Sequence, residues 1–195
     1  MIEPKQHQHF ILHKPYGYLS QFINNQNRRR NKKLLGELHN FPNGTMAIGR
    51  LDETSEGLLF LTTSGKMSNY ITSHNVEKEY YVQVDGIITK EAIERLQNGV
   101  DINVNNALYT TKPCQARLLN YTDNEFILNR KVRDERHGPK SWMAITLKEG
   151  KFRQVRKMTA TVGHPTLRLI RVRIGKIKLS INSGIVKEVE TLDID

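Results

Sequence analysis

The pattern of apolar and polar positions divides the chain into short segments that mostly favour strands. Residues 58–62, LLFLT, form a continuous apolar run, which is typical of a strand buried on both faces. Residues 79–85, EYYVQVD, alternate, so that Tyr80, Val82 and Val84 share one face. We also expect strands at residues 10–12, 18–22, 45–48, 114–119, 125–128, 141–147 and 167–174, the last with the alternating apolar and basic residues of a half-exposed strand.

Three segments have the signals of helices. Residues 64–73 predict a short helix, and residues 90–97 lie between a capping Thr89 and Gly99, where a helix is expected to stop. Residues 152–162 place Val155, Met158, Thr159 and Val162 on one face. Many strands mixed with few helices predict an α+β fold with a largely antiparallel sheet. Without repeats or long linkers, residues 1–195 are expected to form a single domain, with residues 1–9 disordered.

The net charge of the chain indicates the kind of partner. Thirty Lys and Arg residues against 20 Asp and Glu residues give +10 and a pI near 9.7. Such a field attracts polyanions, either nucleic acid or an anionic membrane surface, although a merely soluble basic protein is the alternative. Residues 24–33, NNQNRRRNKK, predict a mobile basic loop, either a solvated surface or a phosphate contact.

Other features exclude several classes of protein. The single cysteine, Cys114, cannot form an intrachain disulfide, which favours a reducing cytosol, and no run approaches the roughly 20 apolar residues of a membrane span. The sequence has no GxxxxGK[ST] phosphate loop, no GxGxxG and no GxSxG. His7 and His9 stand alone near the N-terminus, so we expect neither a metal nor a cofactor.

Three residue types remain that can carry chemistry. Asp52 follows a small turn and precedes the buried run, and it either closes a turn beside a solvated Arg50 or takes part in a reaction centre. Arg156 on the last predicted helix can hold a carboxylate bidentately and keep it ionised, as a nucleophile requires, or it can be a surface arginine. Tyr80 either packs in the core or stacks on a base while its hydroxyl handles a proton.

The same residues lie in three motifs that resemble a known family. GRLDETSEGLLFLT at 49–62, KEYYVQVDG at 78–86 and EGKFRQVRKMTATVGHPTLRLIRVRIG at 149–175 resemble, in order, the motifs of the RsuA-type RNA pseudouridine synthases. Two further segments, NGVDINVNNALYTTKPCQARLL at 98–119 and SWMAITLKEG at 141–150, resemble the RluE-type enzymes of 23S ribosomal RNA within that family. Lys151 and Phe152 depart from the Arg-Asn that relatives often show, which affects contacts made by those two positions only.

The resemblance implies roles for individual residues. Asp52 corresponds to the catalytic aspartate, Tyr80 to the residue under the uracil, and Arg156 to the partner of the Asp52 carboxylate. Arg50 is implied to lie near the flipped nucleotide. The RNA-binding set, implied by the motifs and by the basic loop, is Arg50, Lys78, Arg153, Arg28, Arg29 and Arg30.

The resemblance also implies the fold and the activity. It predicts the pseudouridine synthase catalytic fold, a mixed sheet in two lobes flanked by helices and loops. The expected reaction isomerises a specific uridine of 23S ribosomal RNA, free or in the assembling large subunit, without a cofactor. A catalytically inactive ribosome assembly factor with the same fold is the alternative. We expect a cytoplasmic monomer without the N-terminal S4-type domain of many relatives, because the first strand begins near residue 10.

Overall fold

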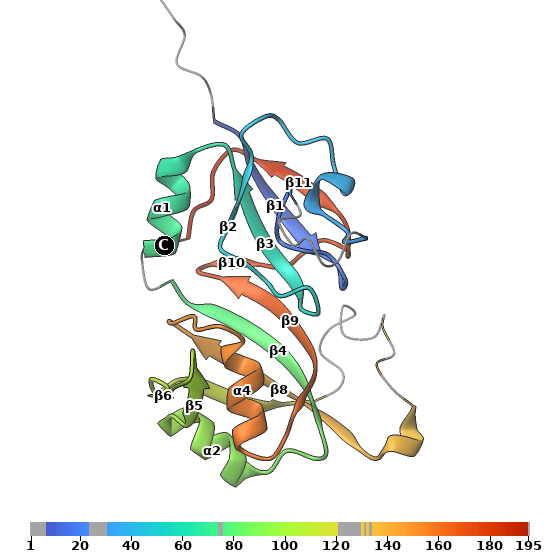
Figure 1. Cartoon of the computed structure of the whole chain (residues 1–195), viewed down its shortest axis with the longest axis vertical. Helices are drawn as coiled ribbons and strands as arrows, with labels where there is room; N and C mark the ends of the chain where they lie inside the picture. The colour runs from blue at the N-terminus through green and yellow to red at the C-terminus, as the bar shows by residue number, and fades with distance from the viewer. Residues whose placement is uncertain are drawn as a thin grey trace, which may run out of the picture. The chain divides into compact units, whose positions relative to one another are not determined.

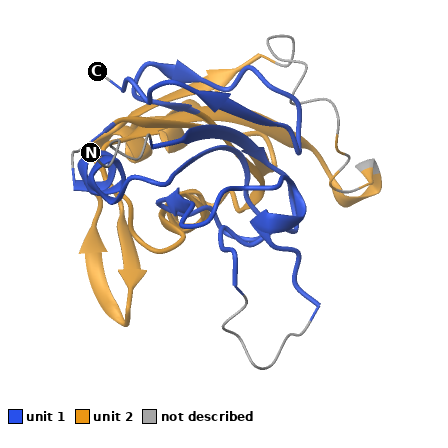
Figure 2. Cartoon of the chain, turned by 90° about the horizontal axis from the view of Figure 1, so that it is seen from above, with its two compact units in different colours: residues 1–76, 173–195 blue, residues 77–172 orange. Residues whose placement is uncertain are grey.

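Strands and helices follow one another irregularly along the chain, which confirms the predicted α+β class (Figure 1). The computed structural model describes residues 7–23, 31–73, 76–120, 130, 132 and 134–194. They fall into two compact units, residues 1–76 with 173–195 and residues 77–172, shown in blue and orange in Figure 2. Within the described part of the chain, no helix is long and apolar enough to cross a membrane.

The first unit is built around the continuous apolar strand. β3 pairs antiparallel with β1, so that Phe10 faces Leu61 and Leu12 faces Leu59. These side chains form a buried cluster. Phe41 packs against it, and its ring makes an edge-to-face contact with Phe10 at 5.4 Å between ring centroids. The elements of this unit are β1 His9–Lys14, η1 Leu35–Glu37, β2 Met46–Ile48, β3 Glu56–Thr62, α1 Gly65–Ser73, β10 Ile177–Lys178 and β11 Val186–Val189.

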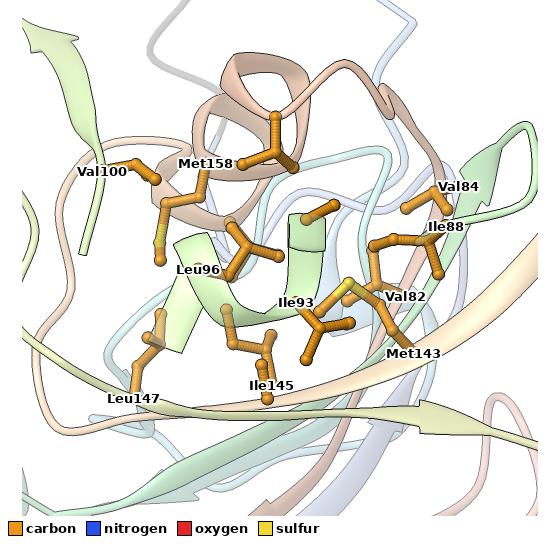
Figure 3. Packing of buried hydrophobic residues seen from close by; sticks show 14 of the residues in the cluster. Val82, Val84, Ile88, Ile93, Leu96, Val100, Met143, Ile145, Leu147 and Met158 are labelled. Carbon is orange, nitrogen blue, oxygen red and sulfur yellow. The ribbon is translucent and has the colours of Figure 1, made fainter. Parts of the chain in front are cut away.

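The second unit places two helices and a sheet around a larger core (Figure 3). Strand order is β9-β4-β8-β7, and β8 pairs antiparallel with both β4 and β7. Val82 and Met143 from the strands meet Leu96 and Met158 from the helices, all four fully buried. The elements are β4 Lys78–Asp85, α2 Lys90–Asn98, β5 Asp101–Val104, β6 Ala107–Thr110, β7 Gln115–Leu119, η2 Glu135–His137, β8 Lys140–Leu147, α4 Gln154–Thr161 and β9 Thr166–Ile174, which continues into the first unit.

Helix α2 begins and ends at the capping residues that the sequence predicts. The Thr89 hydroxyl accepts a hydrogen bond from the Ala92 backbone N–H, as an N-cap should. Gly99 ends the helix with a φ of +94°, and a Cβ at this position would lie 2.4 Å from the Thr111 carbonyl oxygen. Only glycine fits such a close approach, so the helix stops where the sequence predicts.

Other predictions need correction. Residues 18–22 are not a strand: Tyr18 makes one isolated bridge to Lys33, and two further backbone hydrogen bonds, Leu19 N–H to Lys33 and Leu35 N–H to Gln21, do not extend it into a ladder. Residues 1–6 and 125–128 lie outside the described residues, and the expected N-terminal disorder is wrong for His9, which is buried in β1.

The basic side chains of β9 are also more buried than predicted. Arg168 and Arg171 are each only 3% exposed, so this strand is not half-exposed and does not offer these guanidinium groups to solvent phosphates. The Arg168 guanidinium lies 6.0 Å from the centre of the Trp142 ring, which is a cation–π arrangement. Alternation of apolar and basic residues was misleading here because a long arginine stem can pack like an apolar side chain.

Candidate active site

Asp52 lies in a turn between β2 and β3 that the rest of the first unit holds in place. Gly49 enters the turn with a φ of +69°, which favours glycine, and the Ser55 N–H donates to the Asp52 carbonyl at 3.0 Å. The Ser20 hydroxyl donates to the Leu51 carbonyl at 2.8 Å and accepts from the Leu51 N–H at 3.0 Å. These bonds fix the backbone next to a half-buried Asp52.

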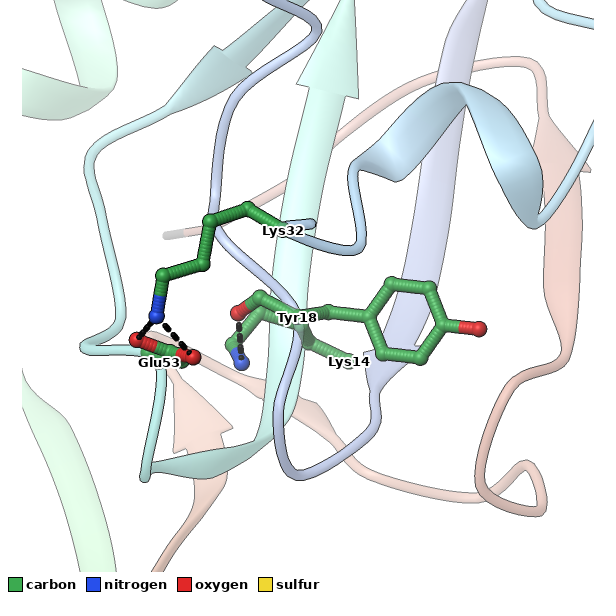
Figure 4. A network of polar contacts seen from close by, with 4 residues as sticks. All are labelled: Lys14, Tyr18, Lys32 and Glu53. Atoms are coloured by element: carbon green, nitrogen blue, oxygen red, sulfur yellow. Dashed lines mark hydrogen bonds and ion pairs between the residues drawn. The ribbon is translucent and has the colours of Figure 1, made fainter. Parts of the chain in front are cut away.

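Lys32 braces the same turn, and Lys14 holds the neighbouring segment, whose Gly17 N–H donates to the Glu53 carbonyl at 2.8 Å (Figure 4). Lys32 forms an ion pair with Glu53 at 2.5 Å, and its side chain is only 9% exposed. Lys14 is fully buried and donates to the Tyr18 carbonyl at 2.7 Å. Lys32 was predicted as part of a mobile basic loop, and this is wrong, because its charge is satisfied within the fold.

Tyr80 and Lys78 share one face of β4 in the second unit. The strand places Tyr80 opposite Ile145 of β8, and the tyrosine ring, half-buried, packs against the large core cluster. Lys78 is also half-buried, and burial lowers the pKa of its ammonium group, with the positive charge of Arg171 lowering it further. This face therefore combines an aromatic ring with a desolvated cation.

Helix α4 carries Arg156 and begins just after Arg153. Val155 and Met158 anchor the helix in the core, which leaves Arg156 half-buried on its flank, with Nη1 3.5 Å from the Thr166 carbonyl. Arg153 is exposed and occupies the N-cap with a φ of +53° and a ψ of 34°. Few residues other than glycine adopt this left-handed conformation, and where it occurs it marks a constrained backbone. The helix therefore starts two residues later than predicted.

A network that sequence reasoning missed holds the segment before α4. The Glu149 carboxylate accepts hydrogen bonds from the Tyr109 hydroxyl, the Lys112 N–H at 3.0 Å and the Gln154 amide at 2.5 Å. The Gln154 oxygen in turn accepts from the Lys151 N–H at 2.9 Å. Burial alone would raise the pKa of Glu149, but these hydrogen bonds outweigh it and hold the pKa below its ordinary value. The same hydrogen bond to Glu149 raises the pKa of the Tyr109 hydroxyl.

This network predicts a pH-dependent loss of stability. The pKa of Glu149 is lower in the folded than in the unfolded chain, so its contribution is complete at neutral pH and disappears as the pH falls below the ordinary carboxyl range near 4.3. Glu149→Gln should lower the free energy of unfolding at pH 7 by about 1 kcal/mol, because one donor loses its acceptor in a partly exposed site. Urea unfolding at pH 7 and pH 3.5 measures both values.

The control for this prediction is Glu94→Gln, which removes an exposed carboxylate from α2. The difference between wild type and Glu149→Gln should shrink at pH 3.5, whereas Glu94→Gln should match wild type at both pH values. An equal loss for Glu149→Gln at both pH values would show that the charge of Glu149 does not matter.

The candidate residues are thus divided between the two units. Lys78, Tyr80, Arg153 and Arg156 belong to the second unit, and Asp52 belongs to the first together with an exposed Arg50. The predicted grouping of Asp52 with Tyr80 and Arg156 joins the two units and stays a prediction. The remaining candidates, Arg28, Arg29 and Arg30, lie outside the described residues.

Comparison with known proteins identifies the family. Residues 8–161 match the family model described as RNA pseudouridylate synthase. The chain therefore belongs to this family, within its RsuA branch, and is an RNA pseudouridine synthase.

Similar proteins within the family carry more specific names. The chain is 40% identical over 171 residues to ribosomal large subunit pseudouridine synthase E of Xanthomonas axonopodis pv. citri (strain 306), covering 87% of this chain and 86% of the relative. It is 37% identical to the protein of the same name from Vibrio parahaemolyticus serotype O3:K6 (strain RIMD 2210633), covering 92% and 73%. A crystal structure of a pseudouridylate synthase superimposes with a TM-score of 0.74 at 23% identity over 96% of this chain and 72% of that one. The predicted pseudouridine synthase fold is confirmed.

Proposed function

We propose that this enzyme isomerises a specific uridine of 23S ribosomal RNA to pseudouridine. The observation that carries the proposal is the 40% identity, over most of both chains, to a protein named ribosomal large subunit pseudouridine synthase E. The formal charge of +10 supports a polyanionic substrate, since it speeds encounter with phosphate chains. We propose that the protein acts as a cytoplasmic monomer on free 23S RNA or on the assembling large subunit.

The reaction explains why no cofactor is required. The C1′–N1 bond of uridine breaks, the uracil turns, and a C1′–C5 bond forms, while C5 loses a proton and N1 gains one. Bonds and electrons balance without oxidation, hydrolysis or an energy source. The uridine must first leave its helical stack, which costs a few kcal/mol and least in loops or mismatches.

We propose that Asp52 is the residue that begins this reaction. An ionised carboxylate can attack the sugar or the base, or remove a proton from the sugar. The braced turn supports this role, because Ser20 and the Lys32–Glu53 ion pair hold the backbone on either side of Asp52 in place. Catalysis depends on such fixed placement of the reacting group.

Tyr80 and Arg156 are proposed to support the freed base and the carboxylate. The Tyr80 ring offers a platform on which uracil can stack, worth about 1–3 kcal/mol, and its hydroxyl can help remove the C5 proton. Arg156 can hold the Asp52 carboxylate ionised through a bidentate pair. Arg50, Lys78 and Arg153, together with residues 28–30, are proposed as RNA contacts.

The proposal is tested by the release of tritium from RNA labelled at C5 of uridine. Unmodified 23S transcripts should release tritium up to about one equivalent per RNA, and 16S transcripts of equal length should release none. Pseudouridine mapping in ribosomal RNA from cells that lack the protein should show one uridine left unmodified. RNA binding without tritium release from any transcript would instead favour the inactive assembly factor.

A further inference from the structure

The segment before α4 displays an aromatic ring to solvent. Phe152 is 66% exposed, more than any other aromatic side chain in the described part of the chain. Single exposed apolar residues are ordinary on protein surfaces, so exposure by itself requires no explanation. The surroundings of Phe152 are what distinguish it.

Cations lie close to the ring in the chain. Lys157, in the first turn of α4, has its Nζ 5.3 Å from the centre of the Phe152 ring. Arg153 follows Phe152 and is exposed, whereas the Nζ of Lys151 lies 4.7 Å from the centre of the Tyr109 ring. An aromatic ring among positive charges is the combination with which proteins bind single-stranded nucleic acid, because the ring stacks on a base while the cations contact phosphates.

The backbone around Phe152 is fixed in advance of binding. On its C-terminal side Arg153 is held in the left-handed conformation, with a φ of +53°. On its N-terminal side the Lys151 N–H is bonded to Gln154, which is itself bonded to Glu149. A ring presented by a constrained segment loses less conformational entropy on binding than one on a free loop.

We propose that Phe152 is a stacking platform for an unpaired base of the substrate RNA, with Arg153 and Lys157 contacting the adjoining phosphates. The inference rests on the proposed function and adds to it a contact that the reacting uridine does not use. Phe152 lies in the segment just before α4, the helix that carries Arg156.

Substitution at position 152 separates stacking from simple burial. Phe152→Ala should weaken binding to an unmodified 23S transcript by roughly 5- to 20-fold, within the range measured for loss of one base stack. Phe152→Tyr should bind like wild type, and Phe152→Leu, which is apolar without a ring, should resemble the alanine variant. The matched control is Ile87→Ala, a 61% exposed apolar residue elsewhere in the same unit.

Salt dependence and crosslinking test the remaining parts of the proposal. Lys157→Gln should reduce the slope of log affinity against log salt concentration by about one, as expected for one lost phosphate contact. Ultraviolet crosslinking of wild type to the same transcript should attach a nucleotide to the peptide that carries Phe152. Thermal unfolding of each Phe152 variant should match wild type, because the ring is exposed.

Two outcomes would overturn this inference. The first is binding by Phe152→Ala equal to that of wild type and Ile87→Ala, and the second is full binding by Phe152→Leu. Neither depends on turnover, so affinity tests the platform even if wild type releases no tritium. Conversely, normal tritium release by a Phe152→Ala variant with wild-type affinity would leave the proposed function standing and remove only the platform.

Discussion

Replacing Asp52 with asparagine is expected to lower the rate of pseudouridine formation by at least about 10³-fold, because the amide can neither attack nor accept a proton as the carboxylate does. RNA affinity and thermal stability should change little. The variant keeps the size of the side chain, and the turn depends on contacts of its neighbours Leu51 and Glu53. Tritium release under single-turnover conditions, with binding measured separately on the same transcript, provides both quantities.

The control for the Asp52 prediction is Glu94→Gln, which removes the same charge from the exposed surface of α2. It should retain full activity and show how much of any loss is due to net charge alone. An Asp52→Asn variant that turns over within about tenfold of wild type would show that Asp52 is not the residue that starts the reaction.

Local signals in the sequence were enough to predict most of the elements. The apolar run at residues 58–62 became β3, with every residue buried, and Thr89 and Gly99 cap α2 at the expected ends. Such signals work because they depend on neighbours only a few residues away. The β5–β6 hairpin was missed although its signal was present: Asn105 and Asn106 have φ values of +52° and +63°, a two-residue turn that asparagine tolerates.

The supports of the site could not be predicted in the same way. The ion pair of Lys32 with Glu53 spans 21 residues, and the bond from Tyr109 to Glu149 spans 40. No periodicity or spacing marks such partners, since the fold alone brings them within reach. The alternating pattern was misleading at Arg168 and Arg171, where it suggested a half-exposed strand but the side chains are buried. The motifs therefore indicate candidate residues for the reaction, and the structure adds the contacts that hold the neighbouring backbone.

Replacing Arg156 with alanine should lower the rate by about 10²- to 10³-fold, the usual cost of removing one preorganised charged partner from a reaction centre. Arg156→Lys keeps the charge without the planar fork and should fall between wild type and alanine. Because Arg156 is half-buried on a helix anchored by Val155 and Met158, thermal unfolding must be measured for each variant. The matched control is Arg95→Ala, which removes an exposed arginine from α2.

A double-mutant cycle decides whether Arg156 acts through Asp52. If the guanidinium serves mainly to hold the carboxylate ionised and oriented, Arg156→Ala should cost little more activity once Asp52 is already asparagine, because residues that act as a unit are not additive. Full additivity of the two losses would show that Arg156 acts elsewhere, on the RNA or on α4 itself. Since Asp52 and Arg156 belong to different units of the chain, strong coupling would be evidence that substrate-competent enzyme brings these two residues into one reaction centre.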